Sequence, residues 1–382
     1  MKSYKKRVIV IFSLASFLND LGSDMIFPVW PLFVTTVLGA NMVILGLIDG
    51  IGKALVSISQ VVSGYLSDKY NNKKIFIWTG YLFGTISRIG YSLSPSWQWL
   101  IPFKIIDRSG KMRGAPRDAM VANVSNHSDR GKNFGILRTM DNLGAVVGII
   151  SSMILLGILG YRKLFFLAAI PSFIGAMLIL IFIKEKKTKD IFPGLHFKDF
   201  NPNLLKFFIL SGVFSLASFS YSFLLIFSNK LGYKATTLPL FYLIYTLVAS
   251  LSAYLFGAAA DKYGRKNLLF ISYGLFGIMS LSFIVINSKS FLFIPFILYG
   301  LHLGSLEPVQ KTFVSELAPK NLRASILGAF KMVVGLLALP ASIIAGLLWE
   351  NVSIRAPFIF SSILSMVAII ILFFVKENNL RS

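Results

Sequence analysis

The sequence contains no cysteine, and acidic residues are scarce, with 16 Asp and Glu against 38 Lys and Arg. The absence of cysteine excludes disulfides, thiolate metal sites and cysteine nucleophiles. Charged residues make up only 14% of the chain, whereas 55% of it is hydrophobic. Water-soluble domains carry a larger share of charge, so this composition predicts an integral membrane protein.

Long apolar runs recur from one end of the chain to the other. Each is close to the roughly 20 residues that a helix needs to cross the hydrocarbon layer. They predict twelve spans, at residues 8–38, 42–66, 75–94, 97–123, 133–159, 162–183, 204–230, 236–259, 267–287, 290–316, 322–349 and 355–375. The basic start at Lys5, Lys6 and Arg7 is also typical of a signal peptide, but the apolar stretch continues to about Leu38 without a cleavage site, so it is interpreted as the first span.

The positive charge is spread over the loops and does not form one patch, which argues against nucleic-acid binding. If the N-terminus is cytoplasmic, few basic residues fall in the outer loops, namely Arg162, Lys163, Lys230, Lys234, Lys289 and Arg355. The inner loops carry many more. This asymmetry predicts that both termini are cytoplasmic, in the inner membrane of a prokaryote.

Residues of the first half recur in the second half at one constant spacing. Matching positions lie 193 residues apart, and the pairs are Gly64 with Gly257, Asp68 with Asp261, Arg130 with Arg323, Gly135 with Gly328 and Arg138 with Lys331. The interval between the halves is rich in Lys and contains Pro193 and Pro202. We therefore expect an N-terminal six-helix half (1–183), a cytoplasmic linker (184–203) and a C-terminal six-helix half (204–382), a plan that is typical of secondary transporters.

The loop from Gly64 to Lys74 resembles the hallmark loop of the major facilitator superfamily, and Gly257 to Lys266 is the better matching second copy. The first copy has Asn71 where the family usually has glycine, and asparagine tolerates left-handed backbone better than most residues. The resemblance covers the whole chain. It implies an all-α membrane protein with twelve transmembrane helices in two six-helix halves related by pseudo-two-fold symmetry.

The resemblance is to the drug/proton-antiporter-like branch, and it implies a transporter and not an enzyme. In the family this loop braces one of the alternating-access states. The residues that would do so here are Gly64, Asp68, Lys69, Gly257, Asp261 and Arg265. The alternative for the two aspartates is a solvated turn.

Ionisable side chains inside spans are costly and therefore mark functional candidates. Asp20 and Asp24 lie four residues apart on one face of the first span. In the second span Asp49 and Lys53, also four apart, have the acid-before-base order that favours an intrahelical ion pair, for which a purely structural role is the alternative. The fourth span carries a charged stripe that we expect on one helical face, made of Lys104, Asp107, Arg108, Lys111 and Asp118. In the family the fourth helix often carries an arginine at the place of Lys104. In the fifth span, Gly144 and Gly148 predict a close-packing surface.

A buried carboxylate that gains and loses a proton as access alternates is a natural proton carrier. The candidates for proton coupling are Asp20, Asp24, Asp107 and Glu307. The alternative is a permanently paired network that only holds the helices together. Substrate-binding candidates are the cations Lys104, Arg108 and Lys111, with the aromatic or polar groups Tyr221, Phe223 and His302. For the last three, a packing role is the alternative.

Three functions compete. The first is proton-coupled efflux of amphiphilic small molecules, and the second is proton-linked uptake of an anionic metabolite or a metal chelate. The third is a non-transporting membrane receptor. Gly50-Ile51-Gly52-Lys53 only superficially matches a phosphate-binding loop, because Leu47 stands where the first glycine is required. The expected partners are a small-molecule substrate, protons and the lipid bilayer. We expect no cofactor, no resident metal and a monomer.

Overall fold

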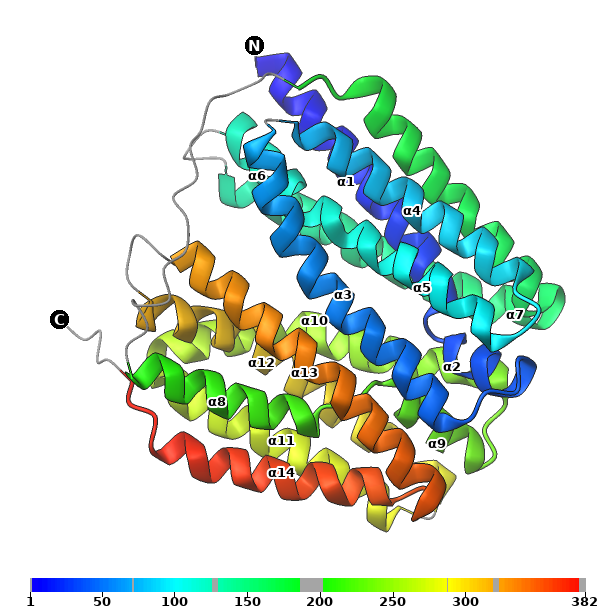
Figure 1. Ribbon diagram of the computed structural model, residues 1–382, viewed down its shortest axis with the longest axis vertical. Coiled ribbons are helices and arrows are strands. Elements are labelled where there is room, and N and C mark those ends of the chain that lie inside the picture. The colour runs from blue at the N-terminus through cyan, green and yellow to red at the C-terminus, as the bar shows by residue number, and fades with distance from the viewer. Residues whose placement is uncertain are drawn as a thin grey trace. The chain divides into compact units, whose positions relative to one another are not determined.

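The computed structural model describes residues 2–70, 72–125, 130–185, 202–286, 288–318 and 323–377. Within these ranges the chain forms helices joined by short turns, and no strand occurs (Figure 1). An all-helical fold is what a bilayer requires, because a helix satisfies its backbone hydrogen bonds within one segment. The predicted fold class is confirmed.

The twelve predicted spans correspond to helices or to helix pairs. In the first half these are α1 (Lys2–Ile26), α3 (Met42–Lys69), α4 (Lys73–Leu93), α5 (Leu100–Ser109) with α6 (Gly114–Val124), and α7 (Arg130–Phe182). In the second half they are α8 (Pro202–Ala217) with α9 (Ser222–Lys230), α10 (Leu238–Tyr263), α11 (Arg265–Val285), α12 (Phe293–Leu317), α13 (Arg323–Asn351) and α14 (Ala356–Phe373).

The helix α7 contains two spans. Gly160 interrupts it with φ 68° and ψ 176°, a conformation that glycine adopts without steric cost. Nine stretches within the described ranges are long and apolar enough to cross a membrane, and Asn133–Phe182 is one of them. With this stretch divided at Gly160, α4 and the α5–α6 pair complete the twelve spans.

Three spans are less regular than their apolar runs predict. The first span does not continue as one helix to residue 38: α1 ends at Ile26, and Pro28 is followed by the short α2 (Trp30–Leu32) and a π-helical turn at Phe33–Val37. The fourth span is interrupted by a 3-10 turn at Gly110–Arg113. The seventh span is broken between Ala217 and Ser222.

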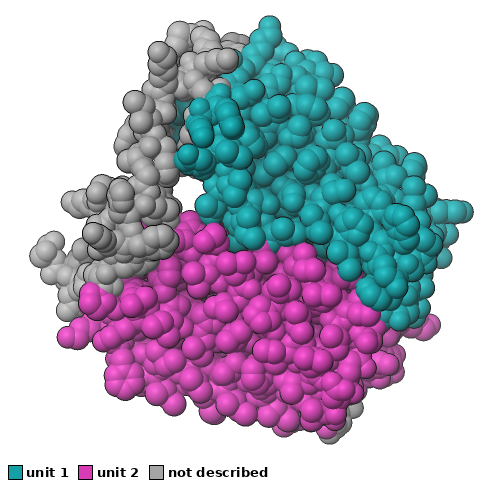
Figure 2. All heavy atoms as spheres, viewed as in Figure 1, with its two compact units in different colours: residues 1–40, 55–193, 235–239 teal, residues 41–54, 194–234, 240–382 magenta. Residues whose placement is uncertain are grey.

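The chain divides into two compact units, which Figure 2 colours separately. Unit 1 consists of Met1–Ala40, Leu55–Pro193 and Ala235–Pro239, and unit 2 of Asn41–Ala54, Gly194–Lys234 and Leu240–Ser382. The boundary between them falls inside α3. The division into halves at a linker of residues 184–203 stays a prediction, since 186–201 lie outside the described residues.

In unit 1, α1 packs along α7 and α4. Gly144 and Gly148 allow this packing, because a Cβ atom at either position would collide with the backbone carbonyl of Phe17 or Leu21 in α1. The predicted close-packing surface of the fifth span is therefore confirmed. In unit 2, the core between α8, α11 and α14 is dominated by aromatic rings, such as Phe214 stacked on Tyr273 with ring centroids 4.3 Å apart.

Candidate substrate and coupling site

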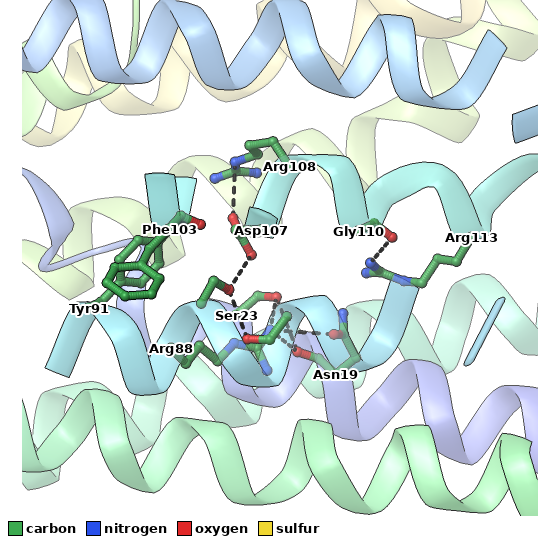
Figure 3. Close-up of polar contacts among 11 residues, drawn as sticks. Asn19, Ser23, Arg88, Tyr91, Phe103, Asp107, Arg108, Gly110 and Arg113 are labelled. Carbon is green, nitrogen blue, oxygen red and sulfur yellow. Dashed lines mark hydrogen bonds and ion pairs between the residues drawn. The ribbon is translucent and has the colours of Figure 1, made fainter. Parts of the chain in front are cut away.

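The fourth span places a charged group in the interior of unit 1. Asp107 on α5 forms an ion pair with its neighbour Arg108, with Oδ2 3.2 Å from Nε (Figure 3). Its other oxygen accepts a hydrogen bond of 3.4 Å from the hydroxyl of Ser87, a buried residue of α4. Asp107 thus contacts a cation of its own helix and a hydroxyl of α4, and it also interacts electrostatically with Arg88, Lys104 and Lys111.

Arg88 of α4 lies at the centre of this region, and the sequence analysis did not single it out. Only 2% of the residue is exposed. Its Nη2 donates to the Ser23 hydroxyl at 2.7 Å and to the Asn19 carbonyl at 3.1 Å (Figure 3). Its Nη1 donates to the Ala168 carbonyl at 3.3 Å. One guanidinium therefore joins α4, α1 and α7.

Gly22 provides the space that Arg88 occupies. A Cβ atom there would come within 2.6 Å of the Arg88 Nη1 and 2.9 Å of the Ser172 hydroxyl, and it would also collide with the Ala168 carbonyl. The arginine inside the third apolar run was itself a visible signal, because the rule on intramembrane charge that selected Asp20 applies equally to it.

The predicted acids Asp20 and Asp24 both belong to α1, and Asp20 lies near this arginine. Asn19 donates from Nδ2 to Asp20 Oδ1 at 2.9 Å. Asp20 also interacts electrostatically with Arg88, Lys111 and Arg117. Asp20 is half-buried, whereas Asp24 is buried. The structure thus brings the predicted acid Asp20 and the predicted cation Lys111 into one polar network.

Two cations of α5 lie over aromatic rings. The Lys104 Nζ atom is 3.9 Å from the centroid of the Trp30 ring, and the Arg108 Cζ atom is 4.8 Å from that of Phe27. Such contacts stabilise a cation without neutralising it. Lys104 is only 4% exposed, whereas Phe27 and Arg108 are half-buried. Of these two predicted substrate ligands, Arg108 is the more accessible.

The predicted stripe of the fourth span does not extend to Asp118. The 3-10 turn at Gly110–Arg113 changes the helical phase, and the Asp118 side chain is 51% exposed beside Arg117. Arg117 also donates to the Ser16 hydroxyl at 2.7 Å and lies 3.7 Å from Asp141. The turn begins where the chain passes close to α4, since a Cβ atom on Gly110 would come within 2.6 Å of the Gly80 carbonyl.

The predicted residues of the second half have different surroundings within unit 2. Glu307 pairs with Lys311 at 2.8 Å, and its side chain is 67% exposed. His302 is fully buried, and its Nδ1 atom lies 2.9 Å from the Ser272 carbonyl oxygen. The centroid of its ring is 5.5 Å from that of Phe214.

Tyr221 packs against Tyr242 with ring centroids 5.2 Å apart, whereas Phe223 is fully buried between Phe219 and Trp349. These contacts are those of packed aromatic residues. A substrate role for Tyr221, Phe223 and His302 stays a prediction.

Comparison with known proteins identifies the architecture. The sequence matches the Major Facilitator Superfamily over residues 12–228 and again over 207–381. The chain belongs to this superfamily. An uncharacterized MFS-type transporter of Methanocaldococcus jannaschii is 35% identical over 382 residues, which cover 96% of this chain and 94% of that protein. The multi-drug resistance efflux pump PmrA of Streptococcus pneumoniae is 26% identical, with 80% of each chain covered.

Solved structures of superfamily transporters share the fold. A bacterial homologue of the human lysosomal transporter Spinster, in an inward-facing and occupied conformation, superposes with a TM-score of 0.81 at 14% identity and covers 98% of this chain and 97% of its own. The nucleoside transporter NupG gives 0.77 at 16% identity, with 96% and 98% covered. The prediction of a transporter and not an enzyme is confirmed.

The hallmark loops of the superfamily lie at the ends of α3 and α10. In the second copy Gly264 has φ 93°, which explains the family's glycine at this place, and Arg265 forms an ion pair of 2.9 Å with Glu316. Gly64 is close to Ala115, and Lys69 lies 5.8 Å from the Tyr65 ring centroid. Gly257 has open space around it. The side chains of Asp68 and Asp261, together with Asn71, lie outside the described residues, so the gating role of the loops stays a prediction.

Proposed function

We propose that this chain is a proton-coupled transporter that exports amphiphilic small molecules. The observation that carries the proposal is the polar network of unit 1, in which Asp20 and Asp107 lie among the cations Arg88, Arg108 and Lys111. Carboxylates inside a membrane span are costly unless they are paired or protonated. A carboxylate whose cation can be exchanged for a proton is therefore suited to coupling.

Asp20 is the foremost coupling residue, with Asp107 second. Asp20 is half-buried and interacts with three cations from α4 and the fourth span. Protonation would remove its attraction to all three at once. The change in charge would then alter how α1, α4 and the fourth span hold together, which links the proton to helix movement.

Export of amphiphilic compounds is supported by two observations. A relative that covers four-fifths of this chain is described as a multi-drug resistance efflux pump. The half-buried ring of Phe27 lies next to the charges of Asp107 and Arg108, so a compound with an apolar and a charged part would meet both kinds of surface. The superfamily places such ligands near the middle of the membrane.

Uptake of an anionic metabolite or a metal chelate is the second candidate, and the cations Lys104, Arg108 and Lys111 favour it. However, Lys104 is buried against Trp30, and Arg108 already pairs with Asp107. Lys104 is therefore shielded from a ligand by burial, and the charge of Arg108 is already paired, which weakens the case for a bound anion. We therefore rank export first.

A proteoliposome experiment separates the two directions. For an antiporter, an acidic lumen drives accumulation of a fluorescent lipophilic cation such as ethidium. For a symporter, an acidic exterior drives accumulation of a fluorescent organic carboxylate. If neither gradient changes the uptake of either probe relative to protein-free liposomes, proton-coupled export is rejected.

Variants locate the coupling residue. Asp20→Asn should reduce gradient-driven accumulation to the level seen without a gradient but preserve substrate exchange at equal pH. Asp118→Asn is the matched control, since it removes an acid with an exposed side chain, and it should retain both activities. Loss of exchange in Asp20→Asn would show that Asp20 binds substrate or supports the fold instead.

The remaining expectations belong to the same proposal. The protein would lie in the inner membrane of a prokaryote with both termini in the cytoplasm. It would work as a monomer and use the two hallmark loops as cytoplasmic gates. The excess of basic residues in the expected inner loops supports this orientation.

A further inference from the structure

The seventh span breaks inside unit 2 at an acidic side chain from another helix. Between α8 and α9 the chain leaves the helix at Ser218–Tyr221. Ser220 Oγ donates to Asp49 Oδ2 at 2.7 Å, and Ser222 Oγ donates to the same oxygen. Asp49 belongs to α3 and is 7% exposed, and both serines are buried. A carboxylate of the second span thus accepts the hydroxyl groups that flank the break.

The cation of this cluster comes from the same helix. Lys53 lies one turn after Asp49 and is attracted to it electrostatically. Its Nζ donates to the backbone carbonyl of Phe219 at 3.4 Å. Because the break frees carbonyl groups from helical hydrogen bonding, Lys53 satisfies one of them. Asp49 therefore accepts from two hydroxyl groups at the break, and Lys53 donates to a backbone carbonyl there.

The same segment of α3, residues 42–54, also packs tightly on α13. A Cβ atom on Gly50 would come within 2.8 Å of the Leu339 Cα, and one on Gly46 would collide with the Ser342 carbonyl. The backbone N–H of Met42 donates to Glu350 Oε1 at 2.7 Å. These contacts involve backbone atoms on both sides, so the segment cannot shift gradually without losing them.

We propose that Asp49 is a second proton-binding site of the transporter, and that its protonation releases residues 42–54 from the break in the seventh span and from α13. The proposal rests on the proton coupling proposed above. Among the groups that face Asp49 are Lys53 of its own helix and the hydroxyls of Ser220 and Ser222, and Glu350 of α13 lies two turns away at Met42.

The chemistry of the carboxylate explains the release. Ionised Asp49 accepts from two hydroxyl groups and attracts Lys53, whereas a neutral carboxylic acid is a weaker acceptor and carries no charge to attract a cation. Protonation would therefore weaken both hydroxyl contacts and the charge pair together.

A proton fits this cluster better than a metal cation does. Both hydroxyl groups are at hydrogen-bond distance from one carboxylate oxygen, and the ammonium of Lys53 already supplies the positive charge beside it. A sodium ion would need those oxygens turned toward it and would be repelled by Lys53. Sodium dependence would therefore contradict the proposal.

The absence of cysteine from the sequence allows a direct test. Ser342 is fully buried where α13 meets Gly46, so Ser342→Cys reports on whether the segment has moved away. The protein is placed in lipid nanodiscs and labelled with a water-soluble maleimide. At one fixed pH near 7.5, adding Asp49→Asn should increase the labelling rate of Ser342→Cys about tenfold, because the amide imitates the neutral acid.

Matched positions control for reactivity and for unfolding. Ser353→Cys, at an exposed position, gives the reference rate at each pH, and Ser280→Cys, fully buried in α11, should stay unlabelled in every background. The normalised labelling rate of Ser342→Cys should rise as the pH falls, and Asp49→Asn should abolish this dependence. Ser220→Ala combined with Ser222→Ala should raise the rate at high pH, since the tie is weakened while the carboxylate remains.

Three outcomes overturn the proposal: an unchanged rate in Asp49→Asn, a pH dependence that survives this substitution, or protection by sodium but not potassium. Labelling at Ser280→Cys in the Asp49→Asn background would also count against it, because the whole unit would then have loosened. No substrate and no gradient are used. Failure of these labelling patterns therefore concerns Asp49 alone, whereas failure of gradient-driven transport concerns the proposed function.

Discussion

Arg88 is a charge placed inside unit 1 with nearly all of its surface covered by protein. It donates to backbone carbonyls of α1 and α7 and to the Ser23 hydroxyl, so three hydrogen bonds fix the position of its guanidinium group. It also interacts electrostatically with Asp107 and Asp20. Because this cation is held in place, protonation of either acid would remove that acid's attraction to it and leave the attraction of the other acid.

Replacing this arginine should be costly. Arg88→Met leaves buried acceptors without a donor and two acids without their cation, so we expect a loss of about 3 kcal/mol or more in the free energy of unfolding. Arg88→Lys should recover only part of this loss, because an ammonium cannot reproduce the planar fork. Unfolding by denaturant in mixed micelles measures both. The control is Arg138→Met, an exposed position in the same unit, and a similar loss there would contradict the assignment.

Gly22 should tolerate no side chain. In Gly22→Ala the new methyl group would meet Arg88, Ser172 and the Ala168 carbonyl, so we expect a destabilisation of about 1–3 kcal/mol. Gly135→Ala is the matched control, because a Cβ atom there has open space. It should stabilise its helix by about 0.5–1 kcal/mol. Equal effects of the two substitutions in the same unfolding assay would refute the steric argument.

At the scale of helices, two carboxylates repeat the same cap in the two halves. Glu185 accepts from the backbone N–H groups of Lys73 and Lys74 at the start of α4, at 2.7 and 2.8 Å. Glu377 accepts from those of Arg265 and Lys266 at the start of α11, at 2.6 and 3.1 Å. The end of each half thus holds the helix that follows each hallmark loop, where the helix dipole also favours a negative charge.

Each cap should contribute to stability independently. Glu185→Ala and Glu377→Ala should each lower the free energy of unfolding by about 0.5–2 kcal/mol, the range for lost helix caps. The two losses should add, because the sites lie in different units. Glu307→Ala is the control, since its exposed pair with Lys311 is worth only about 0.3–0.5 kcal/mol. A loss at Glu307 as large as at Glu377 would argue against the capping role.

Hydropathy predicted where the spans lie, because the length of apolar chain needed to cross a bilayer is a local property of the sequence. It did not predict the 3-10 turn after Ser109, which begins where Gly110 approaches Gly80, thirty residues earlier in the sequence. Asp118 was placed on the wrong face for this reason. The contact between Asp49 and Ser220 spans 171 residues and left no local signal, whereas Arg88 was visible as a charge inside an apolar run.

At the scale of the whole molecule, the repeat in sequence does not extend to the chemistry. The described buried charges of unit 1 form a network through α1, α4 and the fourth span, whereas unit 2 is rich in packed aromatic rings such as Phe227, Phe283 and Phe358. In unit 2 the buried acid Asp49 comes from the first half of the sequence. Neither half of the sequence therefore contains all the parts of one unit.

Because a segment of the first half belongs to unit 2, the structure predicts how the protein behaves when the chain is cut. Residues 42–54 of the first half pack on α13 through Gly46 and Gly50. A protease site inserted between residues 190 and 195 should therefore yield two fragments that co-purify on a C-terminal tag in mild detergent. Gly46→Val with Gly50→Val should reduce the co-purified fraction, because both side chains would collide with α13, whereas Gly135→Val should not. Separation of the unsubstituted fragments, or their full retention in the double variant, would show that residues 42–54 do not hold the two halves together.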